Sequence, residues 1–102
     1  TLIDCVVRPA YSGDVKTIIE AFQNARGKAD VTKMYNYLGQ LNYIYPYHQS
    51  VGFYLEYTGY SSKDWSLFDS LPKVINFYLS YNLTNKYLNR RWMVYVPDQL
   101  SV

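Results

Sequence analysis

Cysteine, histidine and net charge are scarce in this sequence of 102 residues, which has one cysteine, one histidine and a net charge of +2. One cysteine cannot form an internal disulfide, which indicates a reducing compartment such as the cytoplasm and argues against a small secreted scaffold. No apolar run reaches the roughly 18 residues that a membrane-spanning helix needs, so no membrane span is predicted. The small net charge does not by itself indicate a nucleic-acid partner.

Apolar and aromatic side chains are abundant by contrast. Hydrophobic residues make up 49% of the chain and aromatic residues 19%, including thirteen tyrosines. This composition predicts a folded chain rather than a disordered one, and its length suffices for one small core. We therefore expect residues 1–102 to form a single domain. Because the first residue is threonine and no signal-peptide pattern follows, we also expect this domain to be a C-terminal fragment of a longer chain.

The most informative stretch is residues 43–60, for which we predict a central helix. Pro46 suits the first turn of a helix, and Gly59 suits the left-handed position just after the last turn. Between them, apolar and aromatic residues recur at helical spacing and leave little of the surface polar. We expect Tyr54 and Leu55 to lie at the centre of the core, with the rest of the chain packed around them.

The remaining pattern predicts an α+β fold of about five short helices followed by a two-stranded antiparallel segment on one core. Apolar spacing of about 3.6 residues predicts helices over residues 2–8, 14–26 and 31–41, with Asp30 capping the third. For residues 2–8 a strand is the alternative, because two consecutive valines favour one. A Ser61-x-x-Asp64 capping box predicts a short helix that ends at Pro72. Alternating side chains predict strands over residues 75–81 and 92–96, joined by a long cationic loop, residues 82–91.

No pattern for catalysis, cofactor binding or metal binding stands out. His48 and Glu56 lie two helical turns apart, too far to touch, so we interpret His48 as structural and expect Glu56 to meet a basic residue elsewhere. Cys5 is more readily explained as a small buried apolar residue than as a reactive thiolate. We therefore predict no enzyme activity, no cofactor and no metal site.

Candidates for a contact surface come from the cations and the tyrosines. Lys86, Arg90 and Arg91 belong to the predicted loop, where they form either a solvated connection or a patch for phosphate or an acidic protein. Lys28 and Lys33 flank two helices and are weaker candidates. Most tyrosines are expected to pack in the core, but four fall outside the predicted apolar faces and are better contact candidates: Tyr37, Tyr43, Tyr57 and Tyr78.

Three sequence blocks resemble one protein family: TLIDCVVRPAYSG at residues 1–13, YPYHQSVGFYLE at residues 45–56 and RWMVYVP at residues 91–97. With their spacing, they are similar to the C-terminal region of the AbiEi family, and the likeness covers nearly the whole chain. AbiEi proteins are bacterial abortive-infection proteins that serve as antitoxins in type IV toxin–antitoxin systems. The resemblance implies a missing N-terminal winged helix that binds promoter DNA as a transcriptional regulator, and a C-terminal domain that neutralises a cognate nucleotidyltransferase-like toxin.

Two classes of function follow. The first is a cytoplasmic antitoxin module of a phage-defence system whose partner is the cognate toxin. The second is a nucleic-acid-binding module that uses the loop cations and exposed tyrosines. Clustering of Lys86, Arg90 and Arg91 with Lys28 or Lys33 on one face would favour nucleic acid, whereas separation would favour protein contact or a role in solubility alone.

Overall fold

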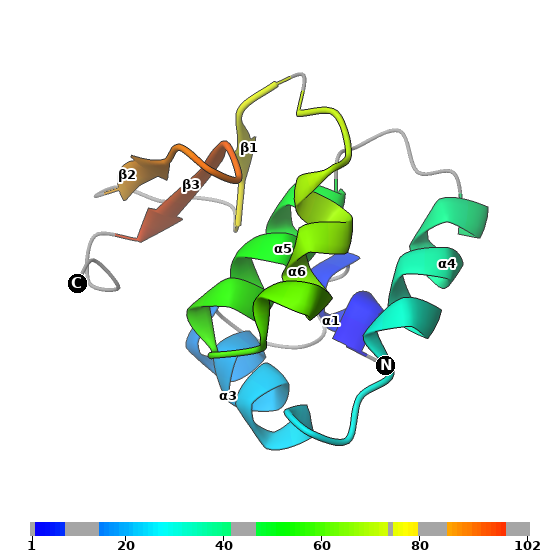
Figure 1. Ribbon diagram of the computed structural model, residues 1–102. Helices are drawn as coiled ribbons and strands as arrows, with labels where there is room; N and C mark the ends of the chain where they lie inside the picture. The colour runs from blue at the N-terminus through cyan, green and yellow to red at the C-terminus, as the bar shows by residue number, and fades with distance from the viewer. Residues whose placement is uncertain (1, 8–14, 42–46, 74, 80–85, 98–102) are drawn as a thin grey trace.

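The computed structural model describes residues 2–7, 15–41, 47–73, 75–79 and 86–97, which fold into a mixed arrangement of α-helices and a three-stranded sheet (Figure 1). The helices are α1 (Leu2–Val7), α3 (Val15–Ala25), α4 (Val31–Leu41), α5 (Tyr47–Tyr57) and α6 (Ser62–Asp69). The strands are β1 (Phe77–Tyr78), β2 (Lys86–Asn89) and β3 (Val94–Pro97). In this part of the chain, no helix is long and apolar enough to cross a membrane.

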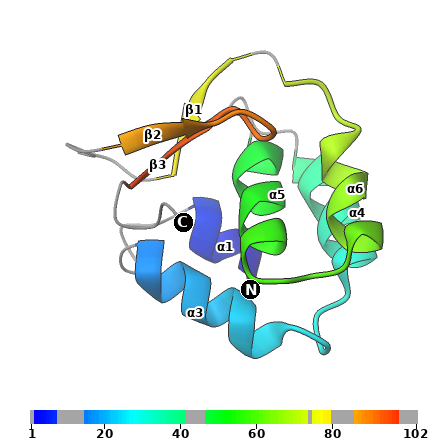
Figure 2. The same ribbon diagram turned by 60° about the vertical axis from the view of Figure 1, so that its left-hand side comes forward.

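Helix α5 is the centre of the molecule, as predicted. It lies between α6 on one side and α1 and α3 on the other, and the sheet lies against it (Figures 1 and 2). Seven consecutive residues, from position 49 to position 55, are buried, and Tyr54 and Leu55 are 1% and 0% exposed. Gly59 closes the helix with the predicted left-handed conformation, at φ +88°. A helix buried around most of its surface organises the other elements because each must pack against it.

The flanking helices begin and end close to the predicted positions. Helix α3 buries Phe22 among its other apolar residues, and Gly27 follows it with φ +87°. The Asp30 carboxylate accepts a hydrogen bond from the Lys33 N–H at 3.0 Å, which caps α4. The capping box predicted for α6 forms only in part. Ser61 occupies the N-cap position, but its hydroxyl makes no bond to the helix backbone.

The sheet corrects two predictions. Its strand order is β1-β3-β2, and β2 lies within residues 82–91, which we had predicted to be a loop. Tyr87 and Leu88 alternate across this strand and pair with β3 in an antiparallel register, so only residues 90–93 form the turn. Because β2 reverses the chain direction before β3, β3 runs parallel to β1. The antiparallel pairing predicted for these two strands was therefore wrong.

Candidate interaction surface

The turn between β2 and β3 is fixed to α5 by Trp92, which is fully buried. Its indole N–H donates a hydrogen bond to the Glu56 carboxylate at 2.8 Å, and its ring lies over Gly52, where a Cβ atom would overlap it. The rings of Trp65 and Trp92 pack edge to face, with their centroids 6.2 Å apart. Trp92 thus anchors this segment in the core.

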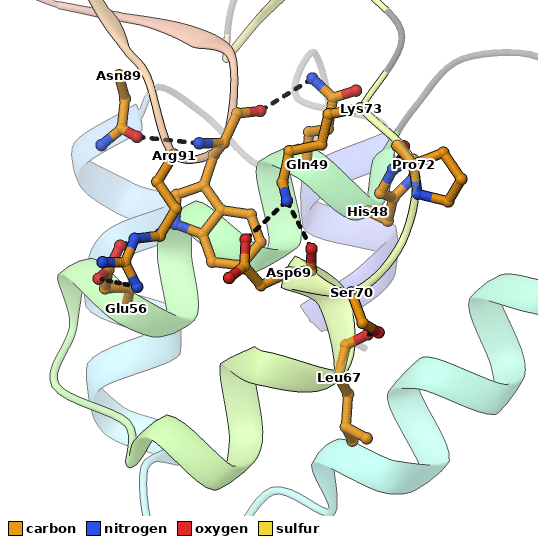
Figure 3. A network of polar contacts seen from close by, with 11 residues as sticks. His48, Gln49, Glu56, Leu67, Asp69, Ser70, Pro72, Lys73, Asn89 and Arg91 are labelled. Atoms are coloured by element: carbon orange, nitrogen blue, oxygen red, sulfur yellow. Dashed lines mark hydrogen bonds and ion pairs between the residues drawn. The ribbon is translucent and has the colours of Figure 1, made fainter.

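The backbone of the same turn is held by two side-chain amides (Figure 3). The buried amide nitrogen of Gln49 donates to the Ile75 carbonyl at 3.0 Å and to the carbonyls of Trp92 and Met93 at 2.9 and 3.1 Å. The side-chain amide oxygen of Asn89 accepts a hydrogen bond from the backbone N–H of Trp92 at 3.1 Å. A donor from α5 and an acceptor from β2 therefore satisfy backbone groups of the turn and tie it to both elements.

Arg91 belongs to this structural network. Its guanidinium lies 3.4 Å from the Glu56 carboxylate and stacks over Trp65, with Cζ 4.6 Å from the ring centre. Glu56 therefore meets a basic residue from another element, as predicted. One carboxylate on α5 thus holds both Arg91 and the neighbouring indole, although the Arg91 side chain remains 46% exposed.

Arg90, one residue earlier in the same turn, is exposed. It lies in the turn of the hairpin, next to backbone groups of Trp92 and Met93 that are hydrogen-bonded to Gln49 and Asn89. An exposed arginine on a fixed turn loses little backbone entropy on binding, and its planar fork recognises carboxylate or phosphate. Both predicted arginines are exposed, but among the described residues only Arg91 is paired with a carboxylate.

The outer face of the sheet brings together two of the other predicted residues. Tyr78 lies directly opposite Tyr95 in the β1–β3 register, and their rings stack with centroids 4.8 Å apart. The Lys86 ammonium lies 5.8 Å from the centre of the Tyr95 ring. Sequence reasoning missed Tyr95 as a surface residue. Its alternation with the buried Val94 and Val96 was the signal that could have identified it.

The other candidates lie elsewhere. Lys28 and Lys33 are exposed near the connection between α3 and α4, on the opposite side of the molecule from the β2–β3 hairpin (Figures 1 and 2). Tyr57 ends α5, is 36% exposed and stacks on Phe53. Tyr37 on α4 is 42% exposed, whereas Tyr43 falls outside the described residues. The predicted cations therefore form two separate groups.

His48 and Lys73 occupy the other end of the network (Figure 3). The His48 Nε2–H donates to the Pro72 carbonyl at 2.8 Å. Burial lowers the pKa of His48, and the nearby Lys73 charge lowers it further, although the bond to Pro72 opposes the shift. Lys73 pairs with Asp69 at 2.6 Å and lies over the Trp92 ring at 5.3 Å. These contacts join the end of α6 to α5.

The described side chains offer no assembled site for a metal. No group of three or more histidine, cysteine, aspartate or glutamate residues converges among them, and the side chain of Cys5 lies outside the description. Comparison of the chain with protein-family models, with curated proteins and with solved structures finds no match.

Proposed function

We propose that this chain is a non-enzymatic regulatory module that acts by contact with another protein, as the antitoxin part of an AbiEi-like protein. The observation that supports this proposal most directly is the β2–β3 turn, which presents Arg90 on a backbone fixed by the buried Trp92. Arginine and tyrosine are the residue types that most often dominate the binding energy of protein interfaces. The partner would be the cognate nucleotidyltransferase-like toxin, and an acidic patch on it would meet this turn.

The separation of the cations favours protein contact over duplex nucleic acid. Proteins that follow a duplex backbone present a continuous basic stripe or patch. Here the α3–α4 connection, which carries Lys28, and the start of α4, which carries Lys33, lie on the opposite side of the molecule from the β2–β3 hairpin (Figures 1 and 2). Arg91 is paired with Glu56. We expect this chain to bind duplex DNA weakly and with steep salt dependence. Promoter binding would belong to the winged helix expected upstream.

The test is co-expression of the chain with the toxin encoded beside it, scored by the growth of the host. Arg90→Ser should reduce protection and leave the free energy of unfolding within about 0.5 kcal/mol of the parent, because an exposed charge contributes little to folding. The matched control is Lys28→Ser, which removes an exposed cation from the opposite side of the molecule.

Two results would contradict the proposal. Full protection by a folded Arg90→Ser variant would exclude the turn as the contact. Equal losses for Arg90→Ser and Lys28→Ser would show that total charge matters rather than this position. Arg91→Ser is not a suitable substitute, because it also removes the ion pair with Glu56 and the contact with Trp65.

A further inference from the structure

The outer face of the sheet is aromatic and exposed. Tyr78 is 50% exposed, and one face of its ring lies against Tyr95, with the two ring planes inclined by 25°. Leu88 lies directly opposite Tyr95 on the other neighbouring strand and is half-buried. A transverse row of Tyr78, Tyr95 and Leu88 therefore crosses all three strands. Because Tyr95 covers one face of the Tyr78 ring, the other face is the one on which another planar group can stack.

The charge on this sheet has one sign. Residues 75–79 and 86–97 contain Lys86, Arg90 and Arg91 but no aspartate or glutamate. Arg91 is paired with Glu56, whereas Lys86 and Arg90 are exposed at opposite ends of β2 and its turn. Lys86 also lies over the Tyr95 ring. The aromatic row is thus flanked by two cations without a neighbouring carboxylate in these segments, which complements an anionic partner.

We propose that this face binds a short segment of single-stranded nucleic acid, with a base stacked on the ring of Tyr78 and phosphates near Lys86 and Arg90. Single-strand-binding surfaces combine aromatic platforms with cations that follow the backbone. An acidic peptide would satisfy the cations but would leave the rings without a stacking partner. A duplex keeps its base faces inside the helix, so it cannot use them either.

This inference goes beyond the proposed antitoxin function and is tested independently of it. The probe is fluorescently labelled oligouridine of about ten nucleotides, a length within the range that small single-strand-binding domains cover. Binding to the full chain is measured by fluorescence anisotropy at two salt concentrations. Labelled duplex RNA of the same length and labelled poly-glutamate are the comparison ligands.

The variants separate stacking from charge. Tyr78→Ala should weaken binding of oligouridine by roughly 5- to 100-fold, whereas Tyr78→Phe keeps the ring and should stay within about twofold of the parent. Tyr37→Ala removes a tyrosine of α4 that is 42% exposed and should have no effect. Lys86→Gln should weaken binding and reduce its salt dependence, and Lys28→Gln is its control on the opposite side.

Each alternative outcome overturns the inference. Absence of oligouridine binding by the parent, or equal losses with Tyr37→Ala and Tyr78→Ala, would show that the row is not a stacking platform. Tighter binding of poly-glutamate than of oligouridine would identify an acidic protein as the partner. If Tyr78→Ala fails to fold, Lys86→Gln against Lys28→Gln decides the question. Growth protection plays no part in these measurements, so failure here leaves the antitoxin proposal standing.

Discussion

Replacement of Gly52 by alanine tests whether the Trp92 ring and α5 are packed as tightly as the structure shows. A Cβ atom at this position would overlap three atoms of the six-membered ring. The ring cannot move aside freely, because its N–H is bonded to Glu56 at 2.8 Å and its backbone N–H is bonded to Asn89 at 3.1 Å. The added methyl group must therefore shift the helix or break one of these bonds.

Three terms set the expected magnitude. Alanine is about 1 kcal/mol better than glycine inside a helix, which favours the variant. Overpacking of a filled core costs about 1–3 kcal/mol, and loss of the indole hydrogen bond leaves a buried donor unsatisfied at a further cost of about 1–3 kcal/mol. We expect Gly52→Ala to lower the free energy of unfolding by about 1–5 kcal/mol, a large part of the stability of a small domain.

Urea denaturation followed by circular dichroism measures this change, and Gly39→Ala supplies the matched control. Gly39 also lies inside a helix, but a Cβ there meets no atom within 4 Å, so this variant should gain up to about 1 kcal/mol. The cost of Gly52→Ala should shrink when Trp92 is already leucine, because the two positions are in contact. A Gly52→Ala protein as stable as Gly39→Ala would refute the packing of the ring on α5.

Two further predictions concern the polar groups around α5. Glu56→Ala leaves the indole N–H of Trp92 without its acceptor and should lower the free energy of unfolding, measured by urea denaturation, by about 1–3 kcal/mol. Glu56→Gln keeps an acceptor oxygen and should lower it by less than about 1 kcal/mol. Equal losses in the two variants would show that the charge pair with Arg91 dominates. His48 has a folded-state pKa below 6.5, so the unfolded chain takes up the proton first and the free energy of unfolding should fall as the pH drops below 6.5. Denaturation midpoints above and below that pH should differ less in His48→Gln, and an unchanged difference would contradict the assignment.

The central helix could be predicted because its signals are local. Gly59 provides the left-handed closure, and aromatic side chains around most of the helix require burial. Asp30 is similar, since a cap depends only on the residues next to it. Alternation likewise predicted a strand through Val94 and Val96, and both valines are fully buried in β3. These features share one property, which is that the relevant neighbours are close in the sequence.

Features that depend on distant residues could not be predicted in this way. The charged and polar residues between the two expected strands suggested a loop, but pairing with β3 satisfies the backbone of Lys86–Asn89. The parallel direction of β1 and β3 followed only from this extra strand. The sequence could not distinguish Arg90 from Arg91 either, because the ion pair between Arg91 and Glu56 joins residues far apart in the chain. The stack of Tyr78 on Tyr95 likewise required the register of the sheet.

The amide of Gln49 has a consequence for how this sequence can diverge. Its nitrogen recognises the carbonyl groups of Ile75, Trp92 and Met93, and every residue type carries such a carbonyl. The side chain at position 75 can therefore change without loss of the link between sheet and helix. Position 49 has no such freedom. Glutamate there would place a carboxylate oxygen, which can only accept hydrogen bonds, against three carbonyl oxygens that also only accept them. Distant descendants of this protein should retain a donor there after the resemblance of the strands has faded.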